Sequence, residues 1–173
     1  MLAFDLDPGP PATIVECCSV ALTLRKLFDR FGLQCFPKSS GSKGMQVYLP
    51  LNTEVSYEET KPFAKALAQA LEKSEPELVI SKMKKELRGG KVFVDWSQND
   101  VSKTTIAVYS LRARARPTAS TPLRWEEVEE CLEREDPELL VFESDAVLER
   151  VEEHGDLFAP VLELQQELPD GIV

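Results

Sequence analysis

The sequence contains no continuous apolar run long enough to span a lipid bilayer, so it does not predict a transmembrane segment. The amino terminus reads Met-Leu-Ala-Phe-Asp and has no basic stretch ahead of an apolar one, so we expect no signal peptide. No Gly-x-Gly-x-x-Gly turn follows the first apolar run, and the residue order of a Walker A loop does not occur. These absences argue against a membrane protein, a dinucleotide-binding fold and a P-loop enzyme.

Cysteine is scarce, and the spacing of Cys17, Cys18, Cys35 and Cys131 does not match a zinc finger. Adjacent cysteines such as the first two are poor disulfide partners. We therefore expect reduced, buried or half-buried thiols, which are typical of a cytoplasmic protein.

Negative charge is concentrated at one end of the chain, whose net charge is −10. Residues 122–173 carry 17 acidic residues and three arginines, a net −14, which leaves +4 for residues 1–121. The first part could meet a polyanion, whereas the last part would repel one. For the tail alone we favour a solvated helical face.

The 173 residues are 43% hydrophobic, which suffices for one domain with a buried core. Apolar spacing predicts helices over residues 13–31, 57–73 and 125–132, and shorter apolar runs predict strands over 2–7, 33–37, 45–51, 91–96 and 104–111. Because later strands adjoin strands, we predict an α+β fold with a mixed or antiparallel sheet and flanking helices. We expect a catalytic core over residues 1–121 and an acidic helical segment over 122–173, which packs on the core through Phe158 and Leu162 within a single domain.

Acidic residues follow two of the predicted strands. Asp5 and Asp7 are two residues apart, so their side chains share one face of a strand, and Asp95 ends another strand. Carboxylates on one face repel each other unless a cation lies between them, and converging carboxylates suit Mg²⁺ or Mn²⁺. Taken singly, each acid is also explained as a cap or a turn residue.

Two basic features accompany the acids. Lys38-Ser39-Ser40-Gly41-Ser42-Lys43-Gly44 is a Gly/Ser-rich loop between two predicted strands, which could turn N–H groups and a lysine toward an anion or be a flexible hairpin. Further along the chain lies a cluster of basic residues, namely Arg88, Lys91, Lys103, Arg112, Arg114 and Arg116. Arg112 and Arg114 would share one face of a strand, where they could bind phosphate or protect a sheet edge.

In this order the motifs resemble the polymerase domain of bacterial ligase D, a member of the archaeo-eukaryotic primase superfamily. Phe4-Asp5-Leu6-Asp7-Pro8 resembles the first metal motif of that family, and residues 38–44 resemble its phosphate-binding motif. Val94-Asp95-Trp96-Ser97-Gln98-Asn99, with Lys103-Thr104-Thr105, resembles its third-acid motif, and residues 109–114 close the series. The resemblance covers about residues 2–122, and the acidic end matches more loosely.

The resemblance implies a nucleotidyltransferase that adds nucleotides to a DNA primer end in end-joining repair or priming. It implies that Asp5, Asp7 and Asp95 hold two divalent cations, Mn²⁺ or Mg²⁺, and are the catalytic residues. Nucleoside triphosphate and DNA ends are the implied partners. The implied nucleotide-binding residues are Ser40, Lys43, Gln46, Arg88, Gln98, Arg112 and Arg114.

The chain departs from the family pattern at two places. Gln46 stands where the phosphate motif usually continues with a histidine, and the region that precedes the first metal motif in the family is lacking here. The missing region could come from a separate chain, and a Lys-x-Asp-Gly adenylation motif is absent, so we expect any ligase to be a partner. Two alternatives stay open: a non-catalytic nucleotide- or DNA-binding remnant of the fold, and a phosphohydrolase of the haloacid dehalogenase type, whose hydrophobic-Asp-x-Asp pattern is similar.

Overall fold

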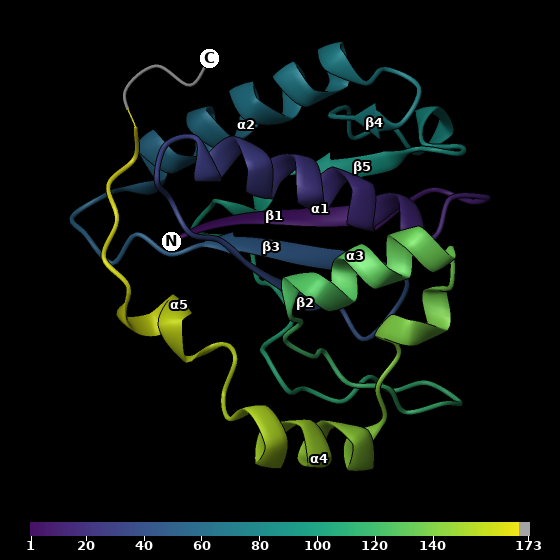
Figure 1. Cartoon of the computed structure of the whole chain (residues 1–173). Coiled ribbons are helices and arrows are strands. Elements are labelled where there is room, and N and C mark those ends of the chain that lie inside the picture. Colours follow the sequence, from purple (N-terminus) through teal and green to yellow (C-terminus); the bar gives the residue numbers. More distant parts are fainter. Residues whose placement is uncertain (170–173) are drawn as a thin grey trace.

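A five-stranded sheet forms the centre of the computed structural model, which describes residues 1–169 (Figure 1). The strand order is β2-β3-β1-β5-β4. The strands are β1 (Leu2–Pro8), β2 (Phe36–Ser39), β3 (Met45–Leu49), β4 (Val79–Ile80) and β5 (Val92–Asp95). Only the β4–β5 pairing is parallel, because β1 pairs antiparallel with both β3 and β5, and β2 with β3. This mixed sheet confirms the α+β prediction.

Five helices of the described part of the chain accompany the sheet, and the first three of them occupy nearly the ranges predicted for them. They are α1 (Ile14–Asp29), α2 (Tyr57–Ser74), α3 (Trp125–Arg134), α4 (Ser144–His154) and α5 (Ala159–Glu163), with 3-10 turns at Lys85–Leu87, Trp96–Gln98 and Pro137–Leu140. Thr13 and Glu16 form a capping box at the start of α1, with the Thr13 N–H donating to Glu16 Oε2 at 2.6 Å. None of the helices within residues 1–169 is both long enough and apolar enough to cross a membrane.

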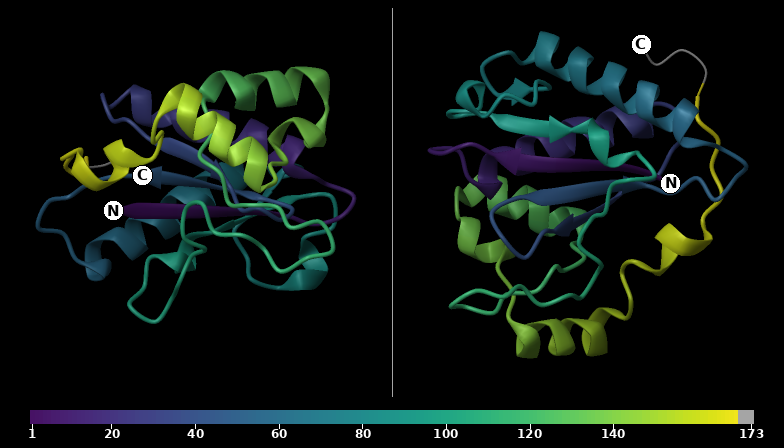
Figure 2. Two further views of the ribbon diagram at one scale, coloured as in Figure 1. Left: turned by 90° about the horizontal axis from the view of Figure 1, so that it is seen from below. Right: turned by 180° about the vertical axis from the view of Figure 1, so that it is seen from behind.

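The two faces of β1 have different environments. Leu2, Phe4 and Leu6 are fully buried and belong to the main core, which includes residues of α1, α2 and α3. The alternate residues Ala3, Asp5 and Asp7 point to the opposite face, as the two-residue strand period requires. Helices α1 and α3 lie on one side of the sheet, and the long loop over residues 99–121 crosses the other (Figure 2). The acidic pair therefore faces the loop.

The predicted strand over residues 104–111 does not form. This stretch is irregular, Tyr109 has a positive φ of 64°, and the only ladder contact is an isolated bridge between Leu111 and Ala119. The segment instead folds back on residues 118–120, with Tyr109 N donating to Ser120 O at 2.7 Å and, just after the segment, Arg112 N donating to Thr118 O at 2.8 Å. Arg112 and Arg114 thus do not share a strand face, because there is no strand to hold them.

Several predicted packing positions differ in the structure. Phe158 is 9% exposed and meets the Tyr48 ring edge-on, with centroids 5.1 Å apart, whereas Leu162 is 75% exposed and does not anchor the tail. Helix α1 ends at Asp29, before the predicted end at residue 31, and Phe31 beyond it is exposed. The four cysteines are buried and free, as predicted.

Candidate active site

A single row of side chains crosses four strands on the face beneath the loop. Asp5 of β1 lies directly opposite Asp95 of β5 on one side and Gln46 of β3 on the other. Gln46 in turn lies opposite Lys38 of β2. Directly opposed residues of antiparallel strands have Cβ atoms about 4.5–5.5 Å apart, so the sheet register brings two carboxylates together at its centre.

Asp7 lies two residues along the same face and is paired with two cations. Lys43 Nζ lies 2.9 Å from Asp7 Oδ1, and Arg88 Nη1 lies 3.3 Å from Asp7 Oδ2. Arg88 is further held by the face of Phe93, 3.7 Å from the ring centroid, and by donation to Met83 O at 2.7 Å. The Lys43 ammonium and the Arg88 guanidinium therefore lie beside the acids.

Asp95 is oriented by the turn that follows it. Its Oδ1 accepts from Ser97 N at 2.9 Å and from Ser97 Oγ at 2.6 Å, and its Oδ2 accepts from Gln98 Nε2 at 2.9 Å. The local sequence thus fixes Asp95 at the start of a 3-10 turn, where its side chain acts as the cap.

The pKa of the Asp5 carboxyl group is shifted by its surroundings. Burial raises the pKa of Asp5 from 3.8 to about 6, the Gln46 hydrogen bond opposes the rise, and the nearby charges of Asp95 and Asp7 add to it. Burial likewise lowers the pKa of Lys38 to about 8, with the Asp5 charge opposing and Arg112 adding to the shift. The Asp5 carboxylate therefore interacts electrostatically with Asp7, Asp95 and Lys38.

The donor chemistry fits a hard divalent cation, because carboxylate oxygens on one face are the ligands that Mg²⁺ and Mn²⁺ prefer. Within residues 1–169, however, no group of three or more His, Cys, Asp or Glu side chains is gathered so that it could hold a metal ion. The partners of Asp7 and Asp95 explain the difference, since Asp7 is turned to Lys43 and Arg88, and Asp95 to its own turn.

A pocket of about 270 Å³ opens beside the acids. It brings together six of the predicted site residues, namely Asp5, Asp7, Ser40, Lys43, Gln46 and Arg112, and is also lined by Leu6, Ser42, Gly44 and residues 104–106. Asp95, Arg88, Gln98 and Arg114 do not line it. The first three nevertheless contact its acids or their strand partners, while Arg114 reaches the loop by donating to Ser42 Oγ.

The Gly/Ser loop is braced from within. Ser40 Oγ accepts from Ser42 N at 3.2 Å and from Gly44 N at 3.3 Å, so this hydroxyl orders the loop. Gly44 is required by space, since a Cβ there would lie 2.2 Å from Leu6 O, and Gly41 has a φ of +64° against the backbone of Ala119. The loop is thus an ordered wall of the pocket.

Three residues of the site were given no role of their own from the sequence, although Lys38 and Thr105 lie within the quoted motifs. Lys38 is 1% exposed and donates to Ser120 Oγ at 2.7 Å and to Ile106 O at 3.0 Å, which ties β2 to the loop. Tyr48 and Thr105 form hydrogen bonds behind Gln46. Lys38 lies two residues before Ser40, and this strand spacing was the one signal in the sequence that pointed to Lys38. The contacts of Thr105 depend on the path of an irregular loop.

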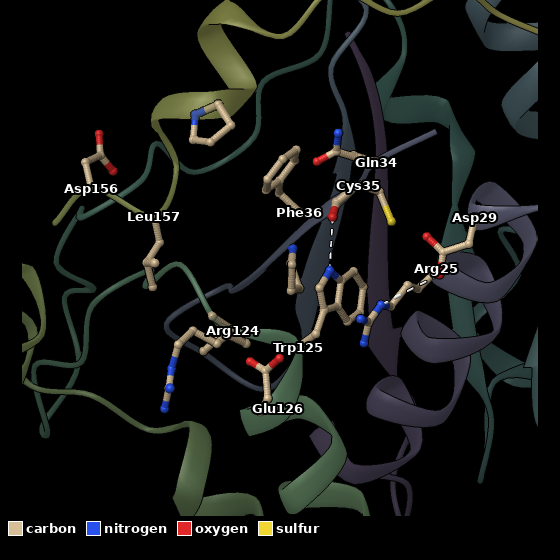
Figure 3. A pocket seen from close by; sticks show the side chains of 13 residues that line it. Arg25, Asp29, Gln34, Cys35, Phe36, Arg124, Trp125, Glu126, Asp156 and Leu157 are labelled. Carbon is tan, nitrogen blue, oxygen red and sulfur yellow. Dashed lines mark hydrogen bonds and ion pairs between the residues drawn. The ribbon is translucent and has the colours of Figure 1, made fainter. Parts of the chain in front are cut away.

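A second pocket, of about 470 Å³, lies away from the acids between α1, the start of β2, the start of α3 and the segment before α5 (Figure 3). Its wall includes Trp125, whose Nε1 donates to Cys35 O at 3.1 Å and whose ring stacks under Arg25. None of the predicted site residues lines this pocket.

The fold and the site define a protein of the archaeo-eukaryotic primase type, with acids on the open face of a mixed sheet. Residues 1–158 match the family model described as "LigD, primase-polymerase domain". The chain belongs to the LigD primase-polymerase domain family.

Relatives support this assignment over most of the chain. The chain is 45% identical over 160 residues to the "Multifunctional non-homologous end joining protein LigD" of Mycolicibacterium smegmatis, which covers 92% of this chain and 20% of that protein. It is 35% identical over 155 residues to the "Bifunctional non-homologous end joining protein LigD" of Bacillus subtilis, which covers 89% of this chain and 24% of that protein.

A solved structure extends the likeness to three dimensions. The "Polymerase Domain from Mycobacterium tuberculosis Ligase D in complex with DNA" aligns with a TM-score of 0.84 at 47% identity, over 92% of this chain and 54% of that one. The chain therefore spans about a fifth of the length of the curated relatives and about half of the solved domain. The family assignment leaves no basis for the phosphohydrolase alternative.

Proposed function

We propose that this chain carries the nucleotidyl-transfer site of a primase-type polymerase, which adds nucleotides to a DNA primer end during end-joining repair. The observation that carries the proposal is the register of the central strands, which sets Asp5 directly against Asp95 with Asp7 on the same face. Opposed carboxylates destabilise a sheet, so their presence at its centre calls for a positively charged ligand.

Asp5, Asp7 and Asp95 would hold two divalent cations, Mn²⁺ or Mg²⁺. When bound, such cations supply Lewis acidity at the primer hydroxyl and neutralise charge on the departing pyrophosphate. The chain's own part is to orient the carboxylates: Ser97 and Gln98 hold Asp95, and Gln46 holds Asp5.

Lys43, Arg88 and Arg112 would bind the triphosphate, with Ser40 ordering the loop and Arg114 adding charge at its rim. The first two are paired with Asp7 in the free protein. If the Lys43 and Arg88 side chains moved from Asp7 to the phosphate oxygens, the Asp7 carboxylate would be free to bind a metal ion. Nucleotide and metal binding would then support each other.

Two buried polar atoms within residues 1–169 have no hydrogen-bond partner, and both flank the acids. They are Arg88 Nε, a donor, and Gln98 Oε1, an acceptor. A phosphate oxygen would satisfy the first and a sugar hydroxyl the second, which is consistent with nucleotide bound here.

The related polymerase domain from Mycobacterium tuberculosis was solved in complex with DNA, and we propose a DNA primer-template or DNA ends as the partner of this chain too. A separate chain or a ligase could supply the functions of the longer relatives. A cytoplasmic location agrees with the four free cysteines.

The test is primer extension with Mn²⁺ on a recessed DNA end, comparing wild type with Asp5→Ala and Asp95→Ala. We expect both variants to lose extension entirely, while circular dichroism shows an intact fold. Asp145→Ala, which removes an exposed acid of α4, should extend at the wild-type rate. Extension by either site variant at the wild-type rate would refute the metal assignment.

A non-catalytic nucleotide- or DNA-binding remnant of the fold is the second candidate. It is favoured by the pairing of Asp7 with Lys43 and Arg88, and by Gln46 at the position of the family histidine. Under this alternative the wild type would bind nucleotide or DNA, and no enzyme concentration would yield extended primer.

A further inference from the structure

A chain of hydrogen bonds leads from the loop to the central acid. Thr105 Oγ1 lies 3.1 Å from the Tyr48 hydroxyl, which lies 2.9 Å from Gln46 Oε1. Gln46 Nε2 then donates to Asp5 Oδ1 at 3.1 Å. Tyr48 and Gln46 alternate with Val47 on β3, so both point to the same face of the sheet.

The chain has one direction. The tyrosine hydroxyl has a single proton, and the amide oxygen of Gln46 can only accept, so Tyr48 donates to Gln46 and its oxygen accepts from Thr105. Each group thereby donates to the next, and the last bond ends on a carboxylate. Hydrogen bonds aligned in this way polarise one another and strengthen.

The tyrosine decides which end of the Gln46 amide faces the acid. Without the hydroxyl, the amide could rotate and present its oxygen to Asp5, where two acceptors repel. Gln46 therefore requires a partner that fixes its orientation, and Tyr48 is placed to be that partner.

We propose that Tyr48 is a positioning residue, which, braced by Thr105, holds the Gln46 amide toward Asp5 and so sets the Asp5 carboxylate for a divalent cation. The inference rests on the proposed function, since it takes Asp5 as a metal ligand. Residues that hydrogen-bond to metal ligands orient those ligands, and their loss typically costs about 10- to 100-fold in metal affinity.

The link also joins the site to the loop. Thr105 belongs to residues 99–121, and Lys38 donates to the next residue's carbonyl, Ile106 O, at 3.0 Å. The same loop segment therefore supports Tyr48 and is fastened to the sheet beside it. The Tyr48 ring itself packs on Phe158, so phenylalanine in its place keeps the packing and removes only the hydroxyl.

The experiment measures Mn²⁺ binding to the full chain by electron paramagnetic resonance of free Mn²⁺, without nucleotide or DNA. We expect Tyr48→Phe and Gln46→Leu each to weaken binding by about tenfold. The double variant should be no weaker than Gln46→Leu alone, since the two residues act through one contact. Thr105→Val should show a smaller loss.

Tyr109→Phe is the matched control, because the Tyr109 hydroxyl donates to Asp156 at 2.6 Å and lies outside the chain of bonds. It should bind Mn²⁺ as wild type does. Thermal unfolding of each variant separates a loss of structure from a loss of positioning, since a merely structural role would lower the midpoint without this shared, non-additive loss of affinity.

Two failures are distinguishable. Wild-type affinity in Tyr48→Phe, or additive losses in the double variant, would overturn the role of Tyr48 and leave the proposed function standing. Wild-type affinity in Asp5→Ala would remove the metal site itself.

Discussion

Asp5 shows the conflict between stability and function at the scale of one residue. Burial raises its pKa to about 6, and the charges of Asp95 and Asp7 add to the rise. A neutral side chain of the same shape would suit the folded chain better. A residue that costs stability where it stands is the expected mark of a functional site.

The cost of Asp5 predicts a pH-dependent gain in the Asp5→Asn variant. Because folding raises the Asp5 pKa from 3.8 to about 6, the folded state binds more protons in this interval, and stability falls as the pH rises through it. Without metal, Asp5→Asn should be more stable than wild type at about pH 7.5, by roughly 1–3 kcal/mol. The gain should shrink toward about pH 4, where Asp5 is protonated. Urea unfolding in chelator at both pH values measures this, and a gain that does not change with pH would contradict the assignment.

Lys43 and Arg112 give a second prediction at this scale. Both line the pocket beside the acids, so Lys43→Ala and Arg112→Ala should each weaken binding of a nucleoside triphosphate with Mn²⁺ by about tenfold or more, the order expected for a charged hydrogen bond. Lys26→Ala, at the exposed end of α1, serves as the control. Isothermal titration measures the affinities, and unchanged binding in both site variants would count against the pocket.

The sequence predicted that Asp5 and Asp7 share a face of one strand, but not how acids from different strands meet. The two-residue strand period placed Asp5 and Asp7 on one face without any structure. The opposition of Asp5 and Asp95 depends on the register of strands about ninety residues apart, which local patterns do not encode. The place of the Lys38 side chain in the site and the contacts of Thr105 were not predicted, for the same reason.

Among the elements, periodic segments were predicted well and the loop over the site was not. Helices α1, α2 and α3 have regular apolar spacing, and each begins within one residue of its predicted start. Residues 104–111 have the composition of a strand but run as irregular chain over the acids. A strand there would place its polar side chains on alternate faces, whereas the loop turns Thr105 and Arg112 toward one pocket.

Asn99 shows how this loop is joined to the sheet, and it carries the prediction for this scale. Its side chain takes the place of a neighbouring strand, accepting from Ala3 N and donating to Ala3 O, each at 2.9 Å, and it is 2% exposed. Asn99→Ala would leave two buried backbone groups of β1 without partners. We expect a loss of about 2–4 kcal/mol, since each such group costs about 1–3 kcal/mol.

Chemical denaturation measures the loss in Asn99→Ala, with Gln69→Ala on the exposed face of α2 as a control that should stay within about 0.5 kcal/mol of wild type. A similarly small effect in Asn99→Ala would show that water or a neighbouring group replaces the side chain.

At the scale of the whole molecule, the acidic end is part of the core in spite of its charge. Val128 and Cys131 of α3 are fully buried in the same cluster as Leu24 and Phe28 of α1. Residues 121–123 extend the sheet beyond β2, with Ser39 N donating to Thr121 O at 2.8 Å. The charge boundary near residue 122 is therefore not a boundary in packing.

We accordingly propose that residues 1–121 and the acidic segment unfold as one unit, and the two tryptophans allow a direct test because one lies in each part. In Trp125→Phe the remaining fluorescence reports on Trp96, and in Trp96→Phe it reports on Trp125. In each variant the urea midpoint from fluorescence should coincide with that from far-ultraviolet circular dichroism, as a two-state transition requires. Residues 1–121 alone should lack dispersed amide resonances, because removing α3 exposes the apolar face of α1. Separated midpoints in either variant, or a folded spectrum for residues 1–121, would show that the charge boundary also divides two cooperative units.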